Sequence, residues 1–179
     1  WGEVTTENEE EVVAVNRKIH PQITELLSVL SDILNAAKIE YWIDQGTLLG
    51  AYRWGKFIAR DSDADIAIRS EEQFESLLQL LTSELPNTYG CERKGSHCKG
   101  YGIWLKTGGT VKGSYEGREI EWPRVACDAM FYEFNARDKT YVQHYEGFGV
   151  DTCFFPEALI LPLDQIEFEG RVYPCPARV

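Results

Sequence analysis

The first part of the chain has the apolar spacing of helices. Residues 7–19 and 21–38 fit two helical segments, and the second would form one buried stripe: Ile23, Leu26, Leu27, Leu30, Ile33, Leu34 and Ala37. Pro21 suits the first turn of a helix, so the sequence predicts two helices with a break before Pro21. His20, next to that break, is expected to be a cap or a surface residue rather than a metal ligand.

Further along the chain, short apolar runs alternate with helical patterns. Residues 40–43 and 63–68 have the composition of strands, and residues 48–53 between them fit a short helix that Thr47 could cap. Residues 70–84 begin with the capping-box sequence Ser-Glu-Glu-Gln and repeat apolar residues at helical spacing. Strands and helices in this order predict a layered α/β domain.

The C-terminal half is rich in strand patterns. Residues 102–106 and 110–114 flank a Thr-Gly-Gly segment, which predicts a β-hairpin. Residues 124–132 form a mostly apolar run with Asp128 in its middle, and residues 166–174 predict another hairpin around a Glu-Gly turn. The expected fold class is therefore α+β or α/β, with a mixed sheet flanked by helices and a β-rich C-terminal half.

Composition supports a single globular domain over residues 1–179, with a helical N-terminal part over residues 1–38. Hydrophobic residues make up 44% of the chain, and no apolar run reaches the roughly 20 residues that a membrane helix needs. The formal net charge of −11 argues against nucleic-acid partners, which require a basic surface. Because the sequence starts with Trp1, we expect a fragment from which a signal or membrane anchor has been removed.

Five cysteines are many for a cytosolic enzyme domain. Cys91 and Cys98 flank a polar loop, where they could form a disulfide, bind a structural zinc ion together with His97, or stay free thiols. Their spacing favours the disulfide or free thiols over zinc. We therefore expect the lumen of the secretory pathway, such as the Golgi, with the cytoplasm as the alternative. Cys127 lies inside an apolar run and is expected to be a small buried hydrophobe.

Three aspartates at a spacing of two carry the first chemical signal. If residues 63–68 form a strand, then Asp61, Asp63 and Asp65 share one face of it. Carboxylates placed this closely repel one another, and a divalent cation such as Mg²⁺ or Mn²⁺ would compensate the repulsion. A solvated acidic edge without a ligand is the alternative interpretation.

The segment before these aspartates could bind an anion. Backbone N–H groups are free at the start of a helix and cations follow, so we expect four residues to hold the phosphates of a donor: Gly46, Thr47, Arg53 and Lys56. Tyr52 and Trp54 could stack on a base or a sugar, although packing in the core is the interpretation we favour.

Asp128 interrupts an apolar run, and a carboxylate in a central strand is costly unless it is paired or bound to a metal. We expect Asp128 to lie beside Asp63 and Asp65 as a third carboxylate. It would act either as a metal ligand or as the base that accepts a proton from a hydroxyl group. A nearby lysine or backbone group that satisfies Asp128 is the alternative.

Residues 44–68 resemble the signature of the LicD family, which includes fukutin and fukutin-related protein and has a nucleotidyltransferase fold. The resemblance rests on these matching positions: Gly46–Ala51, Arg53, Phe57, Ile58, Asp61, Asp63 and Asp65. Arg60 and Ser62 depart from the family's usual Trp and Asp. Asp128 matches an acid in an apolar strand of the family pattern. The family's further C-terminal helix is missing here, so the domain could be cut short.

The resemblance implies a metal-dependent phosphotransferase that moves a phospho-alcohol, such as phosphocholine or ribitol phosphate, from a CDP-activated donor to a sugar hydroxyl of a glycan. It marks Asp63 and Asp65 as the metal ligands. Nucleotidyl transfer would use the same aspartates and is the alternative activity. An inactive nucleotidyltransferase-like binding module, or an acidic calcium-binding surface, is the non-enzymatic alternative. A metal-dependent glycosyltransferase fits less well, because only a short and mostly helical segment precedes the aspartates.

Overall fold

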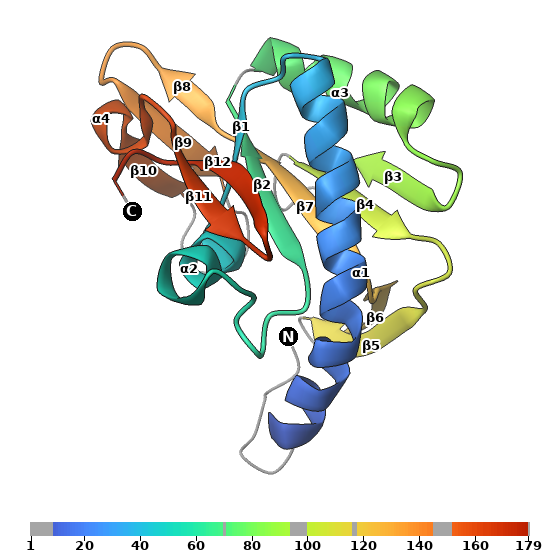
Figure 1. Ribbon diagram of the computed structural model, residues 1–179. Helices are drawn as coiled ribbons and strands as arrows, with labels where there is room; N and C mark the ends of the chain where they lie inside the picture. Colours follow the sequence, from blue (N-terminus) through green and yellow to red (C-terminus); the bar gives the residue numbers. More distant parts are fainter. Residues whose placement is uncertain (1–8, 70, 94–99, 116–117, 145–151, 179) are drawn as a thin grey trace.

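The computed structural model of the chain (Figure 1) describes five stretches of residues: 9–69, 71–93, 100–115, 118–144 and 152–178. Its helices are α1 (Glu9–Ala36), α2 (Gln45–Trp54), α3 (Glu71–Glu84) and α4 (Glu157–Ile160). Within the described stretches, no helix combines the length and the apolar composition that crossing a membrane requires.

The largest sheet has five strands in the order β1-β2-β7-β4-β3. Its strands are β1 (Tyr41–Ile43), β2 (Ala64–Ile68), β3 (Tyr89–Arg93), β4 (Gly100–Leu105) and β7 (Ala126–Phe131). β2 and β7 are parallel, and the other neighbours are antiparallel.

The remaining strands form smaller units. A second sheet has the order β10-β9-β8, while β5 pairs with β6 and β11 with β12. The strands of these units are β5 (Thr110–Tyr115), β6 (Arg118–Pro123), β8 (Glu133–Asn135), β9 (Thr140–His144), β10 (Thr152–Pro156), β11 (Asp164–Phe168) and β12 (Arg171–Cys175). The mixed sheet and the strand-rich C-terminal half confirm the predicted α+β class.

Most local predictions after the first helix are confirmed. The strands predicted at 40–43, 63–68 and 124–132 correspond to β1, β2 and β7, and the helix predicted at 70–84 corresponds to α3. The capping box of that helix starts at Ser70, which lies outside the described residues.

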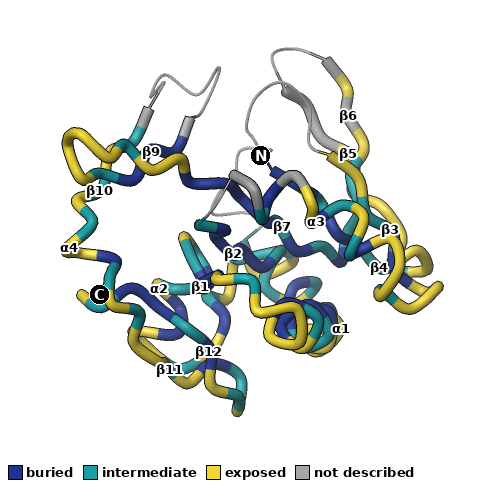
Figure 2. The backbone as a smooth tube through the Cα atoms, turned by 90° about the horizontal axis from the view of Figure 1, so that it is seen from above, coloured by how far each residue is buried: buried dark blue, intermediate teal, exposed yellow. Residues whose placement is uncertain are grey.

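The two faces of the five-stranded sheet are covered differently. α1 and α3 pack on one face, where Leu26, Ile66 and Phe74 belong to the main buried cluster. On the opposite face, Trp42 packs against Tyr132 in a smaller cluster to which β9 and α4 also contribute. Figure 2 shows α1 on one side of the sheet, with the β5–β6 and β9–β10 units on the other.

α1 is one continuous helix, so the predicted break before Pro21 is wrong. A proline inside a helix leaves the carbonyl four residues earlier, here that of Arg17, without its N–H partner. Pro21 and Arg17 both lie on the exposed side, where water can bind this carbonyl. Ile19 and Ile23 on the other side are buried and continue the apolar stripe through the proline. Burial of this stripe outweighs the lost hydrogen bond.

The hairpin predicted between residues 102–106 and 110–114 does not form. Both edges of β4 are already paired, with β7 on one side and β3 on the other, so β5 pairs with β6 instead. The hairpin predicted at residues 166–174 is confirmed by β11 and β12. Glu169 and Gly170 form its turn with positive φ angles of 50° and 78°.

The described cysteines are free thiols: Cys91, Cys127, Cys153 and Cys175. Cys127 is fully buried in β7, which confirms its predicted role as a small hydrophobe. Cys98 and His97 lie outside the described residues, so the predicted disulfide or zinc site at Cys91 and Cys98 stays a prediction.

Replacing Pro21 by alanine should stabilise the protein, because α1 would regain the bond to the Arg17 carbonyl. Alanine is favoured over proline inside a helix by up to about 3 kcal/mol. Thermal unfolding followed by circular dichroism measures the change, with the exposed neighbour Gln22→Ala as control. If Pro21→Ala melted below Gln22→Ala, Pro21 would instead be starting a second helix.

Candidate metal and phosphate site

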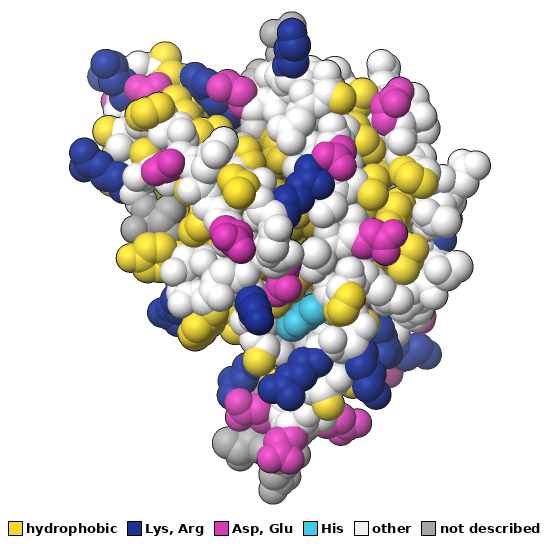
Figure 3. Space-filling view, viewed as in Figure 1, with side chains coloured by type: hydrophobic (Ala, Val, Ile, Leu, Met, Phe, Trp, Pro, Cys, Tyr) yellow, Lys and Arg dark blue, Asp and Glu magenta, His cyan; other side chains and the backbone are white. Residues whose placement is uncertain are grey.

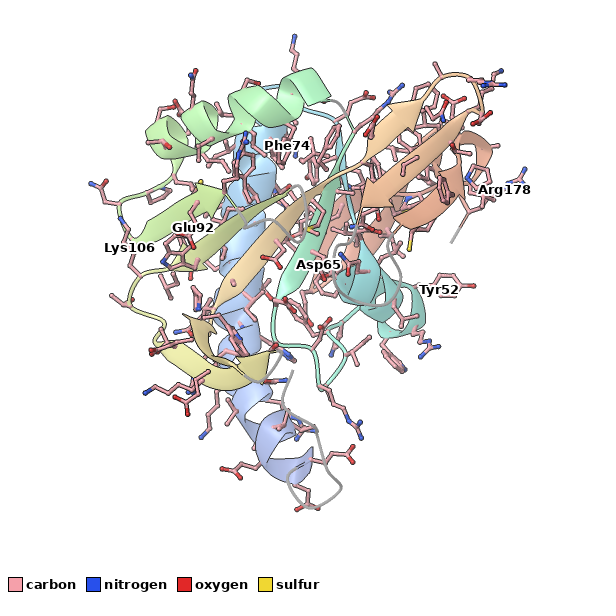
Figure 4. The ribbon with its side chains drawn as sticks, turned by 180° about the vertical axis from the view of Figure 1, so that it is seen from behind. Tyr52, Asp65, Phe74, Glu92, Lys106 and Arg178 are labelled. Carbon is pink, nitrogen blue, oxygen red and sulfur yellow. The ribbon has the colours of Figure 1, made fainter. Side chains whose placement is uncertain are left out.

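Asp65 and Asp128 lie side by side because β2 and β7 pair in parallel with these two residues at the same register. Their strand neighbours Ala64 and Cys127 are buried in the core on the α1 side, so both carboxylates project from the opposite face. Figure 4 looks at this face, with α1 behind the sheet and Asp65 labelled at β2. Asp63 comes just before β2, and oxygens of all three carboxylates lie within 4.8 Å of one another. The structure thus brings together the three predicted aspartates.

Asp61 lies outside this cluster, so the expectation that it shares a strand face with the other aspartates is wrong. β2 begins only at Ala64, and Asp61 belongs to the preceding segment, where its N–H donates to the carbonyl of Ile58. Its carboxylate packs against Gly46, where an added Cβ would lie 2.5 Å from Asp61 Oδ2. Burial raises the pKa of Asp61 to about 6, although a hydrogen bond from the Ser62 N–H opposes this.

Asp65 is a strongly destabilised carboxylate within the cluster. Only 8% of its surface is exposed. Burial raises the pKa of Asp65 well above the usual range, and repulsion from Asp63 and Asp128 raises it further. A bound divalent cation would offset both effects. Because the donors are all carboxylate oxygens, the set suits a hard cation such as Mg²⁺ or Mn²⁺, and the residues therefore fit the predicted metal.

Two hydrogen bonds tie the start of α2 to Asp65. Thr47 was predicted to cap the helix, but it lies within the first turn, is fully buried, and accepts the Asp65 N–H at 2.9 Å through Oγ1. The N-cap is Asp44, whose own N–H donates to the Asp65 carbonyl at 3.0 Å. α2 therefore begins at Gln45, before the predicted start at residue 48, because the Thr47 hydroxyl is used by β2 rather than by the helix.

The first turn of α2 can bind an anion beside the carboxylates. The first N–H groups of a helix have no carbonyl partner within it, and the helix dipole favours negative charge at this end. The Gln45 N–H already interacts with the Asp44 carboxylate. The N–H groups of Gly46 and Thr47 have no hydrogen-bond partner among the described residues, and Gly46 adds no side chain of its own beside the Asp61 carboxylate. A phosphate that bridges this turn and a metal would meet both requirements.

Asp44 is a residue near the carboxylates that the sequence analysis did not single out. Tyr132 Oη lies 2.5 Å from Asp44 Oδ2 and 2.8 Å from Gln143 Oε1. Its single hydrogen serves one of these oxygens, so either Asp44 is protonated or Gln143 presents its NH₂ group to Tyr132. Burial raises the pKa of Asp44, and the Tyr132 hydrogen bond opposes the rise. The position of Asp44 directly after a buried strand was the available signal.

The predicted phosphate-binding cations lie at the far end of α2. Arg53 is seven residues beyond Gly46, about 10 Å along the helix axis, and Lys56 follows the helix. Tyr52 and Trp54 are 61% and 58% exposed, so the expectation that they pack in the core is wrong. The reason is that smaller residues form the buried side of α2: Thr47, Gly50 and Ala51.

Comparison with known proteins identifies a family for most of the chain. Residues 38–178 match the family model described as LicD/FKTN/FKRP, nucleotidyltransferase domain. The chain is also similar to a Rickettsia prowazekii (strain Madrid E) protein named "Uncharacterized protein RP689", with 33% identity over 102 residues. That match covers 55% of this chain and 38% of the relative.

Mn²⁺ or Mg²⁺ should stabilise the protein through the three carboxylates. A metal at about 100 times its dissociation constant adds about 2.7 kcal/mol, which corresponds to a melting-temperature rise of roughly 5–10 °C. Asp63→Asn and Asp128→Asn should lose most of this rise. In EDTA both should melt no lower than the wild type, because each removes repulsion with Asp65. The exposed Asp164→Asn is the matched control, and an undiminished metal shift in the first two variants would contradict the assignment.

Asp61 should make the metal-free protein less stable as the pH rises. Its Oδ2 is buried without a hydrogen-bond partner among the described residues, and its pKa of about 6 means that the folded state holds a proton which the unfolded state releases at lower pH. Stability is therefore lost between roughly pH 4 and pH 6. In EDTA, Asp61→Asn should melt increasingly above the wild type across this range and keep a constant advantage beyond it. Parallel curves of melting temperature against pH would show that Asp61 contributes nothing.

Proposed function

Because the chain belongs to the LicD/FKTN/FKRP family of nucleotidyltransferase domains, we propose that it is a metal-dependent phosphotransferase acting on glycans. It would transfer a phospho-alcohol, such as phosphocholine or ribitol phosphate, from a CDP-activated donor to a sugar hydroxyl. The main support is the convergence of Asp63, Asp65 and Asp128 beside the first turn of α2. Phosphoryl transfer depends on positioning and on stabilising negative charge, and this arrangement offers a means for both.

Asp63, Asp65 and Asp128 would hold the Mg²⁺ or Mn²⁺ ion. When bound, the ion would neutralise charge on the donor diphosphate and on the departing CMP. Gly46 and Thr47 would donate backbone N–H groups to the same diphosphate. The Thr47 hydroxyl, which accepts the Asp65 N–H, would position the carboxylate rather than contact the donor.

The acceptor hydroxyl would attack the phosphorus that carries the alcohol, and the bond from this phosphorus to the oxygen retained by CMP would break. The proton of the acceptor must go to a base. Asp63 and Asp128 are half-buried whereas Asp65 is buried, so an acceptor can reach either of these two carboxylates more easily than Asp65. Because the family resemblance marks Asp63 as a metal ligand, we assign the proton to Asp128, in addition to a place among the metal ligands.

Gly46 would contact the donor diphosphate, whereas Arg53 and Lys56 would contact a different part of the substrates. The separation of about 10 Å between Gly46 and Arg53 along α2 is too large for one phosphate to touch both backbones. A phosphate or an acidic group of the glycan, or the distal end of the donor, would suit these exposed cations. A secretory-pathway lumen, with the cytoplasm as the alternative, is the compartment we propose.

Nucleotidyl transfer remains the second candidate, because the same carboxylates would serve it. There the nucleotide stays on the acceptor and diphosphate or phosphate leaves. An inactive nucleotidyltransferase-like module is the third, and it would bind metal and nucleotide without turnover. The products formed by the protein distinguish all three.

Incubation with Mn²⁺ and a panel of CDP-alcohols should release CMP, and more so when sugar acceptors are present. Asp128→Asn keeps the size of the side chain and removes its charge, so CMP release should fall by about 100-fold or more while donor binding survives in part. Asp164→Asn should leave turnover unchanged. Diphosphate release from a nucleoside triphosphate would favour nucleotidyl transfer, and donor binding without any product would indicate the inactive module.

A further inference from the structure

One row of residues crosses the five-stranded sheet at the level of the carboxylates. Asp65 pairs with Asp128, Asp128 with Gly102, and Gly102 with Glu92, so β2, β7, β4 and β3 each contribute one residue. Tyr101 and Ile103, the neighbours of Gly102, are buried in the α1-side core. Gly102 and Glu92 therefore belong to the same face as Asp65. Figure 4 shows Asp65 and Glu92 on this face of the sheet.

The next row holds an aromatic ring beside the carboxylates. Trp104 pairs with Ala126 of β7 and with Gly90 of β3, and it lies on the same face as Gly102, two residues away. The indole ring covers Gly90: a Cβ added there would lie 2.6 Å from both Cε2 and Cζ2 of Trp104. Gly90 thus leaves the space that the ring occupies. Trp104 is partly exposed, so the ring also presents a surface to solvent.

The distance from the carboxylates to this ring suits a nucleotide. Neighbouring strands are about 4.8 Å apart, so Gly90 on β3 lies roughly 10 Å from β7, which carries Asp128. A metal-bound phosphate followed by a ribose bridges a separation of this size. Gly102 stands between Asp128 and Glu92 and places no side chain of its own on the sheet surface between them.

Glu92 gives the platform a chemical preference. It is two residues from Gly90 on the same face of β3 and is exposed. A carboxylate accepts hydrogen bonds and donates none, so at the edge of a stacked base it favours an exocyclic amine over a carbonyl. Cytosine carries an amine at the position where uracil carries a carbonyl, and Glu or Asp is a recognised partner for that amine. A sugar ring carries hydroxyl groups and has no such difference between an amine and a carbonyl, so Glu92 would not distinguish sugars in this way.

We propose that Trp104 is the stacking platform for the nucleobase of the donor and that Glu92 selects cytosine by accepting a hydrogen bond from its exocyclic amine. This inference rests on the proposed function and adds to it a base-recognition subsite on β3 and β4. The metal-binding carboxylates would hold the diphosphate, while the β3–β4 pair would decide which nucleotide is bound.

Calorimetry in Mn²⁺ with pyrophosphate, CDP and UDP as probes tests the proposal. Trp104→Leu keeps an apolar cover on Gly90 but removes the aromatic face, so it should weaken CDP binding by about 5- to 100-fold and leave pyrophosphate binding unchanged. Trp104→Phe should restore most of the loss. Glu92→Gln should reduce the preference for CDP over UDP by about 10-fold or more. Phe154→Ala, which truncates an exposed aromatic on β10, is the control and should change none of these affinities.

The outcomes separate this proposal from the proposed function. If the wild type binds neither pyrophosphate nor CDP, the phosphotransferase site fails and the base subsite with it. If it binds both equally, or if Trp104→Leu keeps the full advantage of CDP, the base subsite is overturned while the diphosphate site stands. A Trp104→Leu effect confined to the KM of a sugar acceptor would overturn the base subsite in favour of an acceptor platform. Unchanged pyrophosphate affinity also shows that the variant has folded.

Discussion

The parallel pairing of β2 with β7 is the constraint on which the candidate site depends. It places Asp65 directly beside Asp128, an arrangement that the two carboxylates themselves oppose. The register is held from the other face of the sheet, where Ile66 and Ala129 are fully buried against the helices. A slip of one residue would turn the aspartates into the core and the apolar side chains out of it. Burying each large apolar side chain contributes about 1.5–3 kcal/mol, so the core can hold the carboxylates together without a metal.

The same strand also fixes the helix that completes the site. Asp65 uses its N–H and its carbonyl to hold Thr47 and Asp44, so the first turn of α2 cannot shift relative to the carboxylate. Asp61 packs against Gly46 in this turn, which leaves no room for a larger residue there. The Tyr132 hydroxyl is hydrogen-bonded to Asp44, and the Tyr132 ring packs beside Trp42 in the smaller buried cluster. The candidate metal ligands and the proposed anion-binding turn are therefore joined by direct hydrogen bonds, which hold them together without a substrate.

The sequence alone was sufficient to predict the strands of the main sheet that have apolar patterns and the carboxylate whose burial would be costly. The strands β1, β2 and β7 followed from apolar runs, and Asp128 could be assigned to the carboxylate cluster because an isolated charge in a central strand is costly. The failures came from contacts between distant segments. The break at Pro21 was overruled by burial of the α1 stripe, and Thr47 was drawn from capping into a bond with β2. Trp104 gave no signal, because the role proposed for it depends on the pairing of β4 with β3.

Three glycines lie within β3 and β4, and the reason for a glycine differs from one position to the next. Glycine inside a strand weakens it, so each one calls for a reason. At Gly100 the reason is packing, since a Cβ there would lie 2.9 Å from the Ala129 carbonyl oxygen and 3.0 Å from Met130 Sδ. Gly90 is required because the indole ring of Trp104 occupies the space where a side chain would lie. Gly102 stands between Asp128 and Glu92, where any side chain would project between the carboxylates and the proposed base subsite. In the proposed base subsite an extended nucleotide lies flat against the sheet, and a residue without a side chain at position 102 fits this proposal.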